Sequence, residues 1–586
     1  MQTSPYFTLS KTDSVAPANA GCTAAISGTH QLFLYGRIFE IGEQNVSRKT
    51  ADAITADLLS AYIRRGVRCF AECSGDFVVA ICSSSALRTL TAYRSLTTQH
   101  QIYYTEAALS TGLVQLAGTL PHFAIDTDYF DRFLLGISAL QYAMPATPIA
   151  GIRRLLPGEL LELGADGVRL TRLDHRTYAL ADKPGQTVAD VQPGLLALLQ
   201  SIVGDRLPPD SSATVYSELS GGIDSSLVSA LIAQSGRSVQ FILYNYGEKS
   251  GSLSEQCARA VAGHYAAPLM VLPAEELAAV DLRDLDFPGD EPSVAYWQAA
   301  TVGRALGAIV PAGHRVFSGF GADELFMRRA KILPAVLAQY GWRAALTLSR
   351  EIGVSSHRSA LNLLWQTMVC RLPPWLRGRF NTEDVDDLAL VDGALNWLEP
   401  RAPGSASRWQ NTLSAEGRAA VHACFTGGGV EISGNGSQFA DMKFIAGPCL
   451  EPGGAGYETP FCDLRLIDFM ARDVDWRLIF NWKETHKHLL REAARGILPE
   501  SVRLRGSDAL GVDGILRLFI RRNRDTLRSL AFQSDLPLEN VDEAKLAQAF
   551  DAMCFGSTQA SAHKVHALIG FSWWWRSFKN RMRMLA

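Results

Sequence analysis

The chain has 586 residues, of which 47% are hydrophobic and 20% are charged, and its formal net charge is -3. A single hydrophobic core does not grow to this size, so we expect two or more domains. The nearly balanced charge argues against nucleic acid or an anionic membrane as the main partner, and the absence of any apolar run of ~18 residues argues against a membrane span.

Short apolar segments with the pattern of strands, separated by turn residues, dominate the chain up to about residue 190. They are Leu32–Tyr35, Phe77–Ile81, Leu87–Tyr93 and Ile102–Tyr104. The strongly helical segment Ala51–Arg65 interrupts them, and Gly151–Arg172 has the pattern of a β-hairpin with an Ala-Asp-Gly turn. We therefore expect a layered α+β domain over residues 1–188.

A second domain is predicted to follow the polar linker Asp182–Gln186 and to occupy residues 189–586. The helix Pro193–Val203 begins it, with the proline in the first turn, where no N–H group is needed. A strand, a glycine loop, a helix and another strand then follow, which is the pattern of a parallel α/β unit. The strands and helix are Thr214–Leu219, Ser225–Gln234 and Val239–Tyr244.

Much of the remaining chain is predicted to be helical, over Lys331–Leu398 and Asp463–Arg495. The glycine-rich segment Thr426–Gly436 between them is predicted to be a mobile surface loop. The ten cysteines match no zinc-ligand spacing. Because the polar start of the chain also lacks the apolar core of a signal peptide, we expect free thiols and a cytoplasmic protein.

The segment Ser220–Ser226 has the sequence SGGIDSS, and it lies between a predicted strand and a predicted helix. Its small residues let backbone N–H groups approach an anion, and the helix N-terminus adds partial positive charge. Asp224 would repel a phosphate, so we interpret it as a ligand of Mg²⁺ bound to the phosphate oxygens. The alternative is a glycine turn in which Asp224 only caps the helix.

A second glycine loop begins at Ser318, after the predicted strand Arg315–Phe317. Loops at the carboxyl ends of parallel strands converge on one crevice, so Asp323 is predicted to face Asp224 as a second metal ligand. The alternative is a plain loop with a capping residue. The predicted ATP-binding residues are Leu219, Ser220, Gly221, Gly222, Asp224, Ser225, Ser226, Tyr244, Ser318 and Gly319.

The first loop resembles the pyrophosphate-binding loop of the ATP pyrophosphatase group, which cleaves ATP between its α and β phosphates. Seven motifs in order are similar to those of the asparagine synthetase B-type family: SGDFVVAI, LTAYRSLTTQHQIYY and GIRRLLPGE in the front part, then SGGIDSS, SGFGADELF, PFCDLRL and KHLLREAARGILPESV. The resemblance implies ATP and Mg²⁺ as cofactors. It also implies a glutaminase-like, Ntn-hydrolase-type front domain and an α/β ATP-pyrophosphatase-like synthetase domain with helical additions.

The sequence departs from the family pattern at three places. A glutaminase of this type has cysteine as its first residue, whereas this chain begins with Met1 and its first cysteine is Cys22. We therefore expect no glutaminase activity, and we expect the acceptor nitrogen to belong to the substrate. Phe320 stands where asparagine synthetases have glutamate and β-lactam synthetases have tyrosine. Ser507 stands where the family has its transition-state lysine.

Nearby cations are the candidates to replace that lysine. Arg505 and Arg503 closely precede Ser507 in the sequence. Lys487 and Arg491 are predicted to lie on one helical face, where they either reach phosphate or are ordinary exposed side chains. Two other acidic positions have open interpretations. Asp290 and Glu291 either contact substrate or cap a helix, and Glu458 has the side chain of a general base. The tryptophans 573–575 are predicted to pack in a helix.

Four functions are compatible with these features. The leading one is a lasso-peptide cyclase, which adenylates an Asp or Glu side chain of a precursor peptide and lets the peptide's own amine close an isopeptide (macrolactam) ring. Its expected partners are that peptide and a leader-binding or leader-peptidase protein. The alternatives are a β-lactam-synthetase-like enzyme, an amine-dependent amidotransferase acting on a small molecule, and a non-catalytic nucleotide-binding scaffold.

Overall fold

The computed structural model describes most of the chain outside residues 370–455. The described residues are 7–10, 22–83, 89–98, 100–134, 145–173, 180–245, 249–294, 296–311, 314–326, 332–357, 359–369, 456–481, 483–506, 513–557 and 560–585. Thr426–Gly436, Ser507 and the second half of Lys331–Leu398 lie outside them. No helix of the described residues is long and apolar enough to cross a membrane. The cysteines within these residues are all free thiols.

A five-stranded parallel sheet forms the centre of the second domain, with the strand order β14-β13-β12-β15-β16. Its strands are β12 (Val215–Glu218), β13 (Val239–Asn245), β14 (Leu269–Pro273), β15 (Arg315–Phe317) and β16 (Gly456–Glu458). The chain moves outward from β12 to β14 and then returns to the other side of β12 for β15. The direction of winding therefore changes between β12 and β15, where open α/β sheets bind their ligands.

The front domain contains two antiparallel sheets. The larger has the order β11-β10-β6-β5-β3-β2, and β4 pairs with β3; the smaller has the order β1-β8-β7-β9. The strands are β1 (Thr8–Ser10), β2 (Cys22–Ser27), β3 (His30–Ile41), β4 (Gln44–Asn45), β5 (Cys73–Ser83), β6 (Thr89–Arg94), β7 (Tyr103–Tyr104), β8 (Ala108–Ser110), β9 (Arg153–Arg154), β10 (Glu159–Gly164) and β11 (Gly167–Arg172). The predicted hairpin at 151–172 is present as β10–β11.

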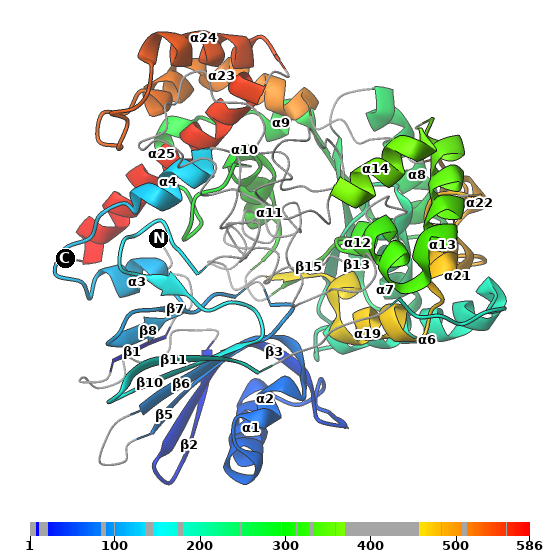
Figure 1. Cartoon of the computed structure of the whole chain (residues 1–586), viewed down its shortest axis with the longest axis horizontal. Helices are drawn as coiled ribbons and strands as arrows, with labels where there is room; N and C mark the ends of the chain where they lie inside the picture. The colour runs from blue at the N-terminus through cyan, green and yellow to red at the C-terminus, as the bar shows by residue number, and fades with distance from the viewer. Residues whose placement is uncertain are drawn as a thin grey trace.

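Alternation along the strands produces a layered domain (Figure 1). In β3, Leu32 and Leu34 pack with α1 (Ala51–Arg65), which has the predicted bounds, and α2 (Arg68–Ala71) lies beside it. Phe33 and Tyr35 point to the opposite face and pack against the smaller sheet. Because successive side chains of a strand point to opposite faces, a strand that is apolar on both sides is buried between two layers. The layered α+β arrangement expected from the sequence is therefore present.

The two domains share a hydrophobic core. Tyr103 of β7 and Phe130 of α4 belong to the same buried cluster as Phe519 and Trp574 near the end of the chain. Helices α3 (Leu113–Ala117) and α4 (Thr127–Leu134) contact α25 (Ala560–Leu585), as Figure 1 shows. Helices α23 (Asp513–Ala531) and α24 (Glu543–Cys554) pack beside α25. The domains are therefore joined by apolar packing.

Helix α6 (Val188–Arg206) follows the predicted linker, and its start differs from the prediction. A capping box of Thr187 and Asp190 begins the helix a full turn before Pro193, which lies inside the helix. The proline dominated the prediction because it favours a first turn. The cap decided the actual start because it satisfies two N–H groups at once.

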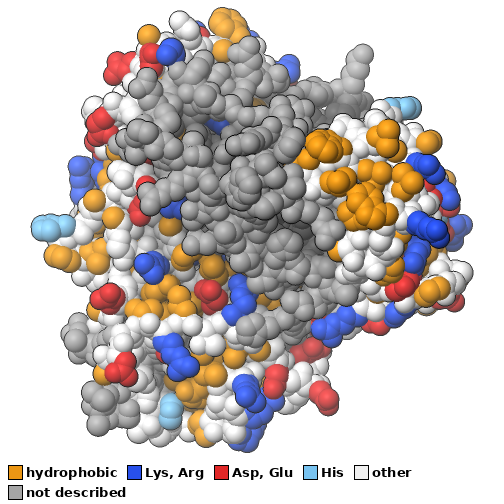
Figure 2. Space-filling view, viewed as in Figure 1, with side chains coloured by type: hydrophobic (Ala, Val, Ile, Leu, Met, Phe, Trp, Pro, Cys, Tyr) orange, Lys and Arg blue, Asp and Glu red, His pale blue; other side chains and the backbone are white. Residues whose placement is uncertain are grey.

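Other helices surround the parallel sheet. They are α7 (Ile223–Gln234), α8 (Lys249–His264), α9 (Ala274–Leu277), η1 (Leu282–Asp284), α10 (Tyr296–Gln298), η2 (Ala299–Gly303), α11 (Arg304–Ile309), α12 (Ala322–Phe326), α13 (Leu333–Ser356), α14 (Ala360–Val369), η7 (Pro460–Cys462), α19 (Leu464–Arg472), α20 (Trp476–Ile479), α21 (His488–Ala493) and α22 (Glu500–Arg503). The helical prediction for 463–495 is thus divided into several short helices. Apolar side chains gather on the surface where α13 and α14 lie (Figure 2), including Trp342, Leu361 and Trp365.

Candidate active site

The first glycine loop connects β12 to α7 and adopts a conformation that only glycine accepts easily. Gly221 has a φ of 73°, and a Cβ there would lie 2.4 Å from the carbonyl oxygen of Ser254. Gly222 is the N-cap residue of α7. The loop therefore lies tightly against α8, with the N-terminus of α7 at the carboxyl edge of the sheet. This is the geometry that an anion site requires.

The side chains of this loop have different roles. The Ser225 hydroxyl accepts the Ser220 N–H at 3.0 Å and lies 2.8 Å from the Ser220 hydroxyl, so it closes the loop. Leu219 is fully buried and extends the pairing of β12 with β13. Ser226 is also fully buried. Among the predicted ATP-binding residues, Leu219 and Ser226 thus support the loop from the core, and Ser220 lies at its partly open side.

The second glycine loop lies directly against the first. A Cβ on Gly319 would lie 2.5 Å from the Ser225 nitrogen and 2.8 Å from the Asp224 carbonyl carbon. Gly321, with a φ of 91°, similarly touches Cys462. Phe320 is half-buried, and its carbonyl oxygen accepts a hydrogen bond from the Cys462 thiol at 3.5 Å. The two loops predicted from separate motifs therefore form one site.

The buried ammonium group of Lys487 joins the two carboxylates that the sequence predicts as metal ligands. Its Nζ lies 2.5 Å from Asp224 Oδ2 and 2.5 Å from Asp323 Oδ1. The lysine side chain is only 6% exposed, whereas Asp224 is 24% and Asp323 is 46% exposed. Of the two carboxylates that cover the lysine, Asp323 is thus the one more open to solvent. The alternative of ordinary surface exposure is wrong for Lys487 and equally for Arg491, which is also buried.

Asp224 has unused capacity to bind a cation. Its Oδ1 is buried and has no hydrogen-bond partner. Burial raises the pKa of this carboxyl and the neighbouring Asp323 raises it further, while Lys487 opposes both effects. An orphaned carboxylate oxygen beside a second, more exposed carboxylate fits Mg²⁺, which binds through one or two carboxylates and substrate phosphates. The described residues contain no cluster of three or more His, Cys, Asp or Glu side chains suited to a metal, so phosphate oxygens or water would complete the coordination.

Arg505 lies at this site, and Arg503 does not. The Arg505 guanidinium donates to the Gly221 carbonyl oxygen and to the Ser254 hydroxyl, each at 3.2 Å. Arg503 instead pairs with Glu492 at 2.9 Å and Glu500 at 2.7 Å. The structure therefore brings Arg505 to the first glycine loop and pairs Arg503 with two carboxylates outside the loop.

A buried carboxylate that the sequence motifs did not reveal lies behind the two loops. Glu218 Oε1 accepts hydrogen bonds from the hydroxyl groups of Tyr244 at 2.9 Å and Tyr457 at 2.5 Å, and Ser318 also donates to it. Burial raises the pKa of Glu218. Glu218 therefore connects the ends of three strands and fixes two predicted ATP-binding residues, Tyr244 and Ser318. Its sequence signal was a charged residue near the end of an otherwise uncharged predicted strand, two positions before Ser220.

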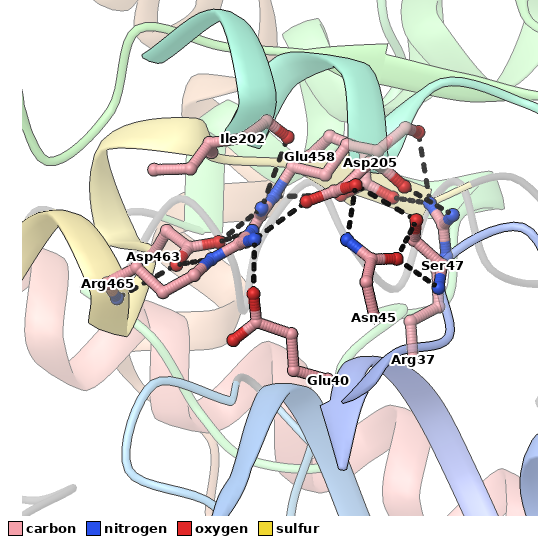
Figure 3. Close-up of polar contacts among 10 residues, drawn as sticks. Arg37, Glu40, Asn45, Ser47, Ile202, Asp205, Glu458, Asp463 and Arg465 are labelled. Carbon is pink, nitrogen blue, oxygen red and sulfur yellow. Dashed lines mark hydrogen bonds and ion pairs between the residues drawn. The ribbon is translucent and has the colours of Figure 1, made fainter. Parts of the chain in front are cut away.

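Glu458 is not placed to act as a general base. Its Oε1 accepts from Arg37 and Arg315, each at 2.8 Å, and Arg206 lies 3.5 Å from Oε2. The nearby guanidinium groups outweigh burial and lower the pKa of Glu458. Arg206 also pairs with Asp463 at 2.5 Å. We call Arg37, Arg206, Arg315 and Arg465, together with Glu458 and Asp463, the arginine clamp. Figure 3 shows the part of it around Arg37, Arg465, Glu458 and Asp463.

Asp290 and Glu291 connect the two domains. The sequence predicts that they either contact substrate or cap a helix, and neither role describes both residues. Glu291 pairs with Arg154 at 2.6 Å and accepts from the Tyr103 hydroxyl at 2.9 Å, and both members of the ion pair are fully buried. Asp290 accepts the N–H of Leu113, at the start of α3, at 3.2 Å. The capping role is therefore correct for Asp290 alone, on a helix of the front domain.

The two glycine loops meet at the switch point of a parallel sheet, which is the place where open α/β folds bind their ligands. The family model described as asparagine synthase matches residues 194–410 and 454–576, which is more than half of the chain. The chain therefore belongs to the asparagine synthase family and has the general character of an ATP-dependent amide-forming ligase. The match begins inside α6 and leaves the front domain outside. No curated protein matches the chain.

Proposed function

We propose that this enzyme adenylates a carboxyl side chain of a precursor peptide and closes a macrolactam ring, as lasso-peptide cyclases do. The carboxylate oxygen attacks the α-phosphorus of ATP, and the bond to the β-phosphate oxygen breaks to release pyrophosphate. The peptide amine then attacks the acyl carbon, an amide bond forms, and AMP leaves while the amine loses a proton. Magnesium would neutralise charge on the phosphates, held by Asp224 and Asp323.

The observation that carries the ATP chemistry is the open pair of carboxylates above Lys487. Both lie at the starts of the helices that follow the two glycine loops, α7 and α12, and Asp224 retains one oxygen without a partner. Lys487 supplies a fixed positive charge beneath them, and Arg505 supplies a planar guanidinium at the edge of the first loop. Preorganised cations of this kind stabilise the charge that develops during phosphate transfer.

The front-domain thiols support an acceptor nitrogen that belongs to the substrate. Glutamine-dependent relatives need a reactive thiolate to release ammonia. Burial raises the pKa of Cys22 and of Cys69 to about 12, and it raises the pKa of Cys73 as well. None of these three thiols is suited to nucleophilic attack near neutral pH. An amine within the substrate makes such a thiol unnecessary.

Product analysis tests the chemistry. A linear precursor peptide of the lasso type should lose one water and gain protection against carboxypeptidase when incubated with the enzyme, ATP and Mg²⁺. AMP and pyrophosphate should form in equal amounts with the ring. Formation of ADP and phosphate would refute the adenylation, and release of AMP without ring closure would refute the cyclase assignment.

Variants of the two carboxylates connect this chemistry to the site. Asp224→Asn and Asp323→Asn should each abolish product formation while the fold persists, because both side chains lie at the rim of the sheet. Asp182→Asn is the matched control, since Asp182 forms an exposed ion pair with Arg477. A wild-type rate in either rim variant would exclude the proposed metal pair.

A further inference from the structure

The segment from Glu458 to Asp463 supports the second glycine loop. The Ser318 N–H donates to the Glu458 carbonyl oxygen at 2.9 Å. A Cβ on Gly321 would lie 2.5 Å from Cys462 Sγ, so no gap separates this segment from the loop. Phe461 packs edge-on against Phe326 of α12, the helix that carries Asp323. A displacement of the segment would therefore displace Asp323.

Arginines hold both ends of this supporting segment. Arg206 reaches Glu458 at one end and Asp463 at the other, and the side chains of all three are at most 2% exposed. Arg465 adds an ion pair to Asp463 at 2.9 Å. Ion pairs fix a segment firmly when each charge is buried and satisfied, because any movement leaves an uncompensated charge.

The front domain contributes directly to this clamp through the end of β3 (Figure 3). Arg37 donates to Glu458 and to the carbonyl oxygens of Asp205 and Arg206. Glu40 lies 3.0 Å from Arg465. The pairing of β3 with β5 is irregular between Ile38 and Glu40, and such bulges redirect side chains.

Phe39 occupies the irregular position and lies among the arginines. Its ring centroid is 4.2 Å from the Arg206 guanidinium carbon and 5.3 Å from that of Arg37, and the side chain is almost fully buried. A ring in this position restrains the guanidinium groups through cation–π attraction and simple packing. The front domain thus supplies both a charge and a surface to the clamp.

We propose that Arg37 and Phe39 are positioning residues for nucleotide binding: through the clamp, the front domain holds the second glycine loop where Asp323 can bind the metal–pyrophosphate part of ATP. The inference rests on the proposed function of the loops. It gives the front domain a role in ATP activation that requires no glutaminase chemistry.

Calorimetric titration of the full-length protein tests this role with two probes. The first is α,β-methylene-ATP with Mg²⁺, and the second is AMP, which lacks the pyrophosphate part. Arg37→Gln should weaken binding of the first probe about tenfold, as the loss of partners that orient metal ligands typically does, and leave AMP binding unchanged. Arg37→Lys should recover part of the affinity, since lysine keeps the positive charge but lacks the planar guanidinium with its several N–H donors.

Two further variants keep the test decisive. Phe39→Leu should also weaken only the first probe, and it decides the matter if Arg37→Gln does not fold. Tyr103→Phe is the matched control, because it removes a buried hydrogen bond between the domains, to Glu291, that is outside the clamp. It should bind both probes like the wild type.

The outcomes separate this inference from the proposed function. Wild-type affinity for α,β-methylene-ATP in folded Arg37→Gln and Phe39→Leu would overturn the positioning role alone. An equal loss of both probes would also overturn it, since that indicates general damage. A wild-type protein that binds neither probe would overturn the proposed function and, with it, this inference.

Discussion

The nucleotide site and the arginine clamp both bring carboxylates to cations, but they differ in how fully the carboxylates are satisfied. In the nucleotide site, Asp224 has an oxygen without a partner and a raised pKa, and Asp323 is almost half exposed. In the clamp, Glu458 and Asp463 are almost fully buried, and arginines lower the pKa of both.

This difference separates a binding site from a structural one. Buried polar atoms in proteins normally find partners, so the unpartnered Oδ1 of Asp224, beside the more exposed carboxylate of Asp323, fits a cation ligand. A carboxylate whose charge is fully compensated by arginines has no capacity left for a metal or a proton. We therefore expect changes in the clamp to affect mainly stability and loop position, and changes in the nucleotide site to affect mainly chemistry.

The largest effect on stability is expected for Asp463→Asn. The substitution leaves Arg206 and Arg465 with less negative charge in a buried site, and breaking a buried pair in this way costs about 3–5 kcal/mol of unfolding free energy. Urea unfolding measures it. The exposed control Asp182→Asn should cost only ~0–1 kcal/mol. Equal effects of the two substitutions would contradict a buried clamp.

In the nucleotide site, a large effect on the reaction rate is expected for Arg505→Ala. Loss of one preorganised donor to the transition state costs about 2.7–4 kcal/mol, or roughly 10²–10³ in rate, with little change in ATP affinity. Single-turnover AMP formation with the precursor peptide measures it. Arg503→Ala should slow the reaction much less, because Arg503 pairs with Glu492 and Glu500. A normal rate for Arg505→Ala would shift the catalytic role to Lys487 or Arg491.

Acid should weaken the clamp. The pKa of Asp463 is lowered from 3.8 to about 2 in the folded protein, mainly by Arg206 and Arg465 acting against burial. Because the folded pKa lies below the unfolded one, this stabilisation is complete above about pH 4 and is lost as the pH falls towards about 2. The raised pKa of Asp224 acts in the opposite direction, because protonation of this carboxyl as the pH falls stabilises the folded protein. Urea midpoints measured across this range should fall less steeply in Asp463→Asn than in the wild type.

The smallest effect is expected for Cys22→Ala. The thiol is partly buried on β2, and its pKa of about 12 leaves it protonated. Ring closure should proceed at the wild-type rate, and glutamate should not be released from glutamine by either protein. Glutamate release that disappears in the variant would show that the front domain retains a glutaminase centre.

The sequence by itself predicted the local elements and the loops that bear the chemistry. Gly221 allows the positive φ of the first loop, and Gly319 allows the second loop to approach the first closely. The bounds of α1 and β15 were also predictable, since apolar periodicity and turn residues act over short distances. Asp224 and Asp323 could be paired because parallel strands end at the same edge.

Only the tertiary structure decided which charges meet. Arg37 and Glu458 are separated by most of the chain, and no local pattern distinguishes a clamped glutamate from a general base. Arg503 and Arg505 likewise differ only in what surrounds them: two carboxylates in one case and the glycine loop in the other. The chemistry of a charged side chain depends on its desolvation and its partners. Packing between distant segments sets both, so the short-range pattern of a sequence does not contain them.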